Sequence, residues 1–176
     1  MIVFYDAADW RHLPVGQPAC FYGDGRYAVT AAEIRAVDPP QSRMITVEGD
    51  GRTCSIIDGK PDNNLSNATV RAFVRERRGA GMAAIIYCPR SWVAEYRRIL
   101  YDSGHGTLLD YPRLYWWIAT LDGKPWTAAE LSADIQANYD ATLPPERIWA
   151  VQNTQIPKVG PGALADQSTL FLPWRP

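Results

Sequence analysis

Carboxylates follow several of the short apolar runs in this sequence of 176 residues. The opening run "IVFY" leads directly into Asp6, and the run "II" at positions 56 and 57 leads into Asp58. Near the end of the chain, Asp166 opens the segment "DQSTLFL". Short runs of β-branched and aromatic residues favour strands, and carboxylates at strand ends are typical of acid–base chemistry. Asp6, Asp58 and Asp166 are therefore candidate catalytic residues, together with other acids that follow strands, such as Asp9, Glu48, Asp50 and Asp122.

Aromatic and polar side chains accompany these carboxylates. Tryptophan faces stack on sugar rings, and paired carboxylates carry out glycosidic acid–base chemistry. A structural role is the alternative, because Asp commonly caps helices and fills turns, and because two adjacent tryptophans in "YWWI" must point to opposite sides of their strand. The candidate substrate-binding residues are Trp10, one of the pair Trp116 and Trp117, Lys60, Asp62 and Gln152.

Composition and charge exclude several classes of function. The net charge is −1, which gives no sign of a surface for nucleic acid or membranes. The apolar runs are far shorter than the roughly 20 residues of a membrane span. The first residues enter a strand pattern directly, so we expect no signal peptide and synthesis in the cytoplasm.

The cysteine and histidine positions do not suggest a metal site. Cys20, Cys54 and Cys88 lack the close pairing of metal ligands, and His12 and His105 fall in unrelated loops. We therefore expect buried free thiols, no metal and no cofactor.

Strand and helix signals alternate along much of the chain. Two capping boxes, Thr30 with Glu33 and Thr127 with Glu130, mark helix starts. Further helices are expected to open at Ser66 or Asn67 and at Ser91. The expected strands cover residues 2–5, 19–22, 44–47, 55–57, 83–88, 114–119 and 148–152.

These elements predict the fold class. Runs such as "AAIIYC" and "LYWWIA" are apolar on both faces, which is typical of parallel strands covered by helices. The stretch "EGDGRT" between two strands is too short for a helix, and the chain after Gln152 reads as loop until "DQSTLFL". We predict one α/β domain over residues 1–176, a small, partly degenerate TIM-type barrel with some helices missing. In such barrels the active site lies at the C-terminal ends of the strands.

The order of the motifs resembles a known family. "IVFYDAAD", "IIDGKPDN", "IIYCPRSW", "YWWIATLDG", "IWAVQNT" and "GALADQSTLF" follow the order of landmarks in glycoside hydrolase family 25 lysozymes. They are especially similar to an actinobacterial and phage branch, a glycoside-hydrolase-like domain of unknown function. The resemblance implies that Asp6 ends the first strand, that Asp58 is the first acid of an Asp-x-Glu motif, and that Asp166 is the acid of the closing segment. It also equates Trp117 with the tryptophan of a Trp-x-Ala strand.

Lys60 departs from this pattern. By the resemblance it occupies the place of the glutamate that is usually assigned as the proton donor. A lysine whose pKa is near its reference value of about 10.4 holds its proton too tightly for an efficient acid. It also tends to keep neighbouring carboxylates ionised. Glu48, Asp50 or Asp62 could supply a substitute acid from a neighbouring loop.

Two functions remain open. The first is a glycoside-hydrolase-like domain directed at peptidoglycan, of phage origin, with weak or lost hydrolytic activity; an active form would be a lysozyme-like muramidase. The second is a non-catalytic barrel used as a structural or host-glycan-binding component of a virion. The expected partners are a cell-wall glycan and other virion proteins, and the expected location is the virion or the host wall. Lys60 favours the second function, whereas the three aspartates favour the first. A metal-dependent phosphodiesterase is weaker, because neither histidine falls at a strand end.

Overall fold

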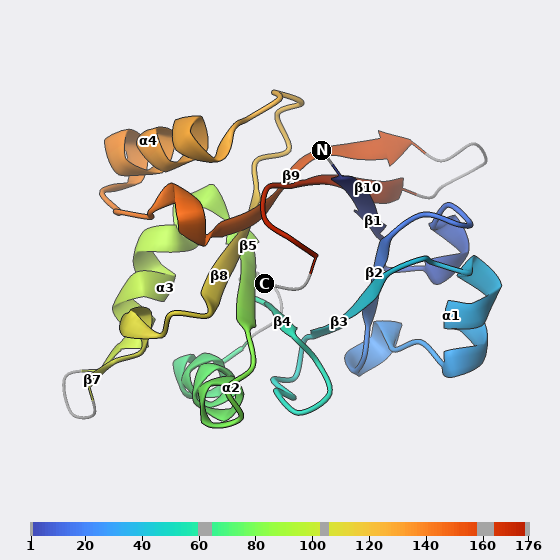
Figure 1. The fold of residues 1–176 in the computed structure, drawn as a ribbon, viewed down its shortest axis with the longest axis horizontal. Coiled ribbons are helices and arrows are strands. Elements are labelled where there is room, and N and C mark those ends of the chain that lie inside the picture. The colour runs from blue at the N-terminus through green and yellow to red at the C-terminus, as the bar shows by residue number, and fades with distance from the viewer. Residues whose placement is uncertain (1, 60–64, 103–105, 158–163, 175–176) are drawn as a thin grey trace.

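The computed structural model describes residues 2–59, 65–102, 106–157 and 164–174. Within these ranges, eight strands close a barrel in the order β1-β10-β9-β8-β5-β4-β3-β2 (Figure 1). All neighbouring strands are parallel except at β10, which is antiparallel to both β9 and β1. The strands of the barrel are β1 (Ile2–Asp6), β2 (Ala19–Tyr22), β3 (Ser42–Thr46), β4 (Ile56–Asp58), β5 (Ala84–Pro89), β8 (Leu114–Ala119), β9 (Ile148–Pro157) and β10 (Leu164–Leu170).

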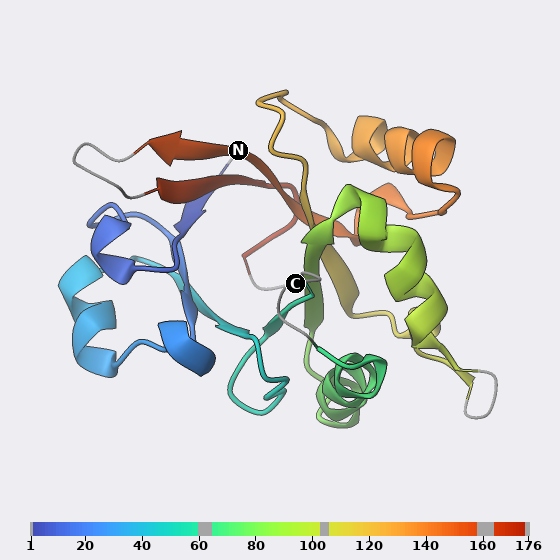
Figure 2. The same cartoon turned by 180° about the vertical axis from the view of Figure 1, so that it is seen from behind.

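Fewer helices surround the strands than in a complete α/β barrel, as the sequence predicts. In Figures 1 and 2, α2, α3 and α4 lie on the side of β5 and β8, and α1 lies on the opposite side. No α-helix separates β3 from β4, where the chain makes a short turn. The fold is therefore a TIM-like α/β barrel with helices missing. The helices are α1 (Ala31–Val37), α2 (Asn67–Gly79), α3 (Val93–Leu100) and α4 (Ala128–Tyr139), and a small sheet outside the barrel joins β6 (Tyr101–Asp102) to β7 (Gly106–Thr107).

The helix starts follow their sequence signals closely. Both predicted capping boxes are present, at Thr30 before α1 and at Thr127 before α4. Ser66 caps α2 by accepting a hydrogen bond from the Thr69 amide. The helix predicted to open at Ser91 begins two residues later, at Val93, because a 3-10 turn over Arg90–Trp92 precedes it.

The last two barrel strands differ from the prediction of a loop after Gln152. β9 continues to Pro157, and β10 begins at Leu164 and pairs antiparallel with it. β1 pairs along its whole length with the second part of β10, from Asp166 to Leu170, which closes the barrel. The segment "NTQIP" lacks the alternating apolar pattern of a strand. Backbone pairing with β10 extends β9 through this segment.

The core has an inner and an outer layer. Inside the barrel, the Phe4 ring lies 5.1 Å from the rings of both Trp117 and Trp149. The adjacent Trp116 belongs to the outer layer, between strands and helices, so the two neighbouring tryptophans do point to opposite sides. After β10 the chain turns back so that the buried Trp174 packs on Phe4 and Trp149 (Figure 2).

Two expectations from composition can be compared with the structure. The three cysteines are buried free thiols, as predicted. Among the helices of the described ranges, none combines the length and apolar character that crossing a membrane requires.

Candidate active site

The structure places the three predicted carboxylates at one end of the barrel. Asp6 ends β1 and Asp58 ends β4, each two positions after a residue that packs inside the barrel. Because side chains alternate along a strand, both carboxylates point inward. Asp166 lies directly opposite Asp6 in the β1–β10 pairing. Opposed residues of antiparallel strands have Cβ atoms about 4.5–5.5 Å apart. We call this end of the barrel, formed by the C-terminal ends of the parallel strands, the mouth.

Two tyrosines share the environment of these carboxylates. The Tyr22 hydroxyl donates a hydrogen bond to Asp58 Oδ2 at 3.2 Å, and Tyr87 lies opposite Asp58 in the β4–β5 pairing. Burial, followed by the negative charges of Asp58 and Asp6, raises the pKa of Tyr22. Burial and the charges of the three aspartates likewise raise the pKa of Tyr87. Both hydroxyls therefore stay protonated at neutral pH and act as hydrogen-bond donors.

Asp6 and Asp58 are only 2% exposed, whereas Asp166 is half-buried. Close packing behind β4 contributes to this burial. A Cβ on Gly59 would lie 2.7 Å from the Tyr96 ring, so glycine is needed directly after Asp58. The Tyr96 hydroxyl donates a hydrogen bond to the Gly59 carbonyl, which fixes the end of the strand.

Gln152 is also placed at the mouth. It is fully buried, and the Tyr87 hydroxyl donates a hydrogen bond to its Oε1 atom. Its Nε2 atom has no hydrogen-bond partner among the described residues. A buried donor without an acceptor is costly, so this amide is suited to a ligand oxygen. Neither tyrosine hydroxyl was identified as a donor from the sequence, although each belongs to a predicted strand.

Trp117 does not offer the stacking surface predicted for it. Its ring has no exposed area, packs 4.5 Å from the Tyr87 ring and donates from Nε1 to Ser168 Oγ at 3.0 Å. The inward side of β8 faces a barrel that is just wide enough to be filled by side chains, so this ring is part of the hydrophobic core.

Trp10 differs from Trp117, because it is half-buried on the loop after β1 and lines a shallow cavity of about 320 Å³. Lys60 and Asp62 lie outside the described residues.

The aspartates of nearby loops have structural tasks. Asp50 accepts hydrogen bonds from the Thr53 hydroxyl and the Arg52 amide, and the bond from Thr53 contributes most to lowering its pKa. It is therefore ionised at neutral pH, which does not suit the role of a general acid. Asp24 accepts from the Val47 amide at 2.7 Å and from the Thr46 hydroxyl, which orders the turn after β3.

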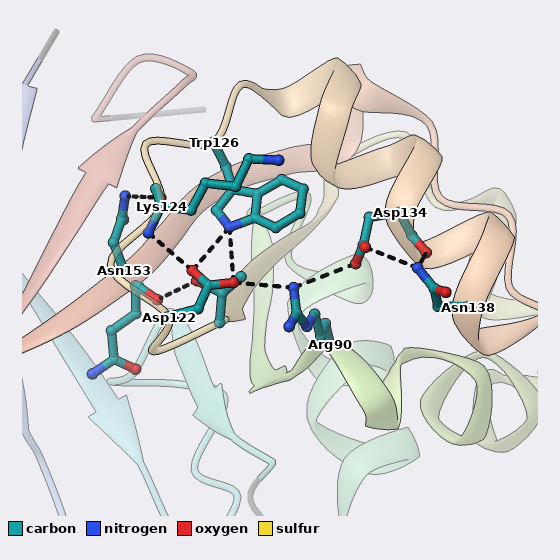
Figure 3. A network of polar contacts seen from close by, with 9 residues as sticks. Arg90, Asp122, Lys124, Trp126, Asp134, Asn138 and Asn153 are labelled. Atoms are coloured by element: carbon teal, nitrogen blue, oxygen red, sulfur yellow. Dashed lines mark hydrogen bonds and ion pairs between the residues drawn. The ribbon is translucent and has the colours of Figure 1, made fainter.

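A network of polar contacts joins the loops that follow β5 and β8 to α4, on the rim of the mouth (Figure 3). Arg90, after β5, contacts Asp122 at 3.2 Å and Asp134 of α4 at 3.5 Å. Burial opposes the ionisation of Asp122, but hydrogen bonds from the Trp126 indole and the Lys124 amide outweigh it and lower its pKa. The network joins the loop after β8 to α4. These contacts join segments that are distant in the sequence, and they were not predicted from it.

Within the described ranges, no group of three or more His, Cys, Asp or Glu residues is arranged to hold a metal ion. A larger cavity, of about 730 Å³, lies at the opposite end of the barrel, where Arg43 and Trp174 contribute to its wall.

Comparisons with protein-family models, with curated proteins and with solved structures found no match to this chain. The chemistry of the mouth and the order of the motifs are thus the basis for assigning a function.

Proposed function

We propose that this chain is a glycoside-hydrolase-like barrel directed at a cell-wall glycan, with weak or lost hydrolytic activity. The observation that carries the proposal is the convergence of Asp6, Asp58 and Asp166 at one mouth. Carboxylates accept hydrogen bonds from sugar hydroxyls, and buried Gln152 supplies a donor that has no partner among the described residues. The motif order that resembles family 25 lysozymes supports peptidoglycan as the glycan and a phage as the source.

Two features support low or absent hydrolysis. A glycosidase acid must be protonated at working pH and close to the leaving oxygen, and Lys60 stands where the resemblance places that acid. Asp50 is ionised by its hydrogen bonds in a turn.

The second candidate is a non-catalytic barrel within a virion, either structural or bound to host glycans. The close packing of the mouth favours it, because Trp117 and Gln152 are both fully buried. A structural component would neither bind isolated walls nor change when wall fragments are added. Binding to walls therefore separates the purely structural role from both glycan-directed roles.

The test combines two measurements on purified actinobacterial cell walls. Co-sedimentation measures binding, and release of reducing ends measures hydrolysis. We expect saturable binding with a Kd between about 1 μM and 1 mM and little or no release. Asp58→Asn should weaken binding only modestly, and Asp140→Asn, at the exposed end of α4, is the matched control. A folded protein that does not bind walls contradicts the proposal, and release at ordinary lysozyme rates contradicts the loss of activity.

A further inference from the structure

The shallow cavity beside Trp10 contains a preorganised aromatic surface. It lies between the loop that follows β1 and the loop that follows β2, and Tyr27 lines it as well. The Trp10 indole donates from Nε1 to Glu33 Oε1 at 2.8 Å. Glu33 is itself held by the capping box at Thr30. The plane of the indole is therefore fixed before any ligand arrives, which reduces the entropic cost of binding.

The charged side chains around this cavity differ in whether they form ion pairs. Arg11 donates two hydrogen bonds to Asp9, each 2.8 Å long, so these two charges neutralise each other. Arg26 has no carboxylate partner in the part of the chain that the structure describes. Its guanidinium carbon lies 4.5 Å from the centre of the Tyr27 ring, which holds it at the cavity. Glu33 adds a negative charge beside Trp10, so the cavity carries no net charge, and Arg26 is the side chain through which it would attract an anion.

The cavity is connected to the mouth through two tyrosine rings that pack against each other at an angle of 53°. The Tyr27 ring packs 5.6 Å from the Tyr22 ring, and the Tyr22 hydroxyl holds Asp58. Asp6 ends the strand whose following loop carries Trp10. A ligand unit in the cavity would therefore be adjacent to a unit at the mouth.

We propose that this cavity binds an acidic sugar, a pyranose ring that bears a carboxylate. The ring stacks on Trp10, and the carboxylate pairs with Arg26, whose planar fork matches a carboxylate in two hydrogen bonds. A volume of about 320 Å³ is at the lower end of the range for ligand sites, which fits a single ring. The inference rests on the proposed function and specifies the substrate class of the same rim.

The test uses a matched pair of probes. One is a tetrasaccharide of alternating glucuronate and N-acetylglucosamine, and the other is the same compound with its carboxylates converted to neutral methyl esters. Calorimetry gives the Kd of each for the wild type, for Arg26→Gln and for the control Arg98→Gln. Arg98 is an exposed arginine of α3 that pairs with Glu95, outside this cavity. Circular dichroism checks that each variant is folded.

We expect the wild type and Arg98→Gln to bind the acidic probe about tenfold more tightly than the ester. Arg26→Gln should bind both probes equally, with its affinity for the ester unchanged. Equal affinities in the wild type, or a preference that survives in Arg26→Gln, would overturn the inference. Co-sedimentation of the wild type with walls separates the two claims. Wall binding without a preference for the acidic probe overturns this inference alone, whereas a folded wild type that does not bind walls overturns the proposed function.

Discussion

At the scale of single residues, the proposal of weak or lost hydrolysis depends on Lys60. We expect Lys60→Glu to raise hydrolysis of peptidoglycan, because the change returns an acid to the Asp-x-Glu arrangement. General acid catalysis contributes about 10² to 10⁴ in rate, so the gain should be visible above a weak background. Release of reducing ends from purified walls measures it.

The control for this prediction is Lys124→Glu, which makes the same change of charge at another position of the rim. It should leave hydrolysis at the wild-type level. If wild-type protein already hydrolyses walls quickly, or if Lys60→Glu leaves the rate unchanged, Lys60 is not the reason for low activity.

Trp117 is expected to act through stability rather than through direct contact with a sugar. Trp117→Ala removes a fully buried ring from the inside of the barrel and should lower the free energy of unfolding by about 3–5 kcal/mol. Ser168→Ala, which removes only the acceptor of its indole hydrogen bond, should cost about 1 kcal/mol. Urea denaturation measures both. A Trp117→Ala variant of normal stability that loses glycan binding would show that the ring is reached by ligand after all.

At the scale of elements, the helix that borders the polar rim network depends on its first turn. The Thr127 side chain accepts from the Glu130 amide, and the Glu130 carboxylate accepts from the Thr127 amide. Thr127→Ala should lower the free energy of unfolding by about 1 kcal/mol. The exposed Thr142, just after α4, supplies the control Thr142→Ala, which should have little effect. Equal losses in the two variants would contradict the role of the cap.

Local signals in the sequence were sufficient for some elements and not for others. The caps at Thr30 and Thr127 could be predicted because they depend on residues three positions apart. The extension of β9 to Pro157 could not, because it depends on pairing with β10.

In the candidate site, too, local signals do not reveal contacts between segments that are distant in the sequence. Strand ends located Asp6 and Asp58, but the hydrogen bond from Tyr22 to Asp58 joins strands that are distant in sequence.

At the scale of the whole molecule, several carboxylates have a lowered pKa in the folded state. The hydrogen bond from Arg11 contributes most to lowering the pKa of Asp9, to about 2, and the pKa values of Glu33, Asp50, Glu95, Asp122 and Glu130 are also lowered. A carboxylate with a lowered folded-state pKa stabilises the fold above its unfolded pKa, and this contribution is lost as the pH falls through the folded value.

The urea midpoint should therefore decrease as the pH is lowered from about 5 towards 2, through and below the reference pKa values of Asp and Glu. Most of these groups are exposed, so the decrease should be gradual and should become smaller at high salt. Asp50→Asn should show a weaker dependence on pH than the wild type. A midpoint that stays constant over this interval would contradict the prediction.

The two ends of the barrel present different candidate places for a ligand, the mouth with the neighbouring Trp10 cavity at one end and the 730 Å³ cavity at the other. Amide resonances recorded while soluble peptidoglycan fragments are added distinguish them directly. The proposed function predicts shifts at Asp6, Asp58, Gln152 and Asp166, together with the Trp10 indole, and none around Arg43 and Trp174. Shifts confined to the cavity at the other end, or no shifts at saturating fragment, would contradict the proposal that the mouth is a glycan site.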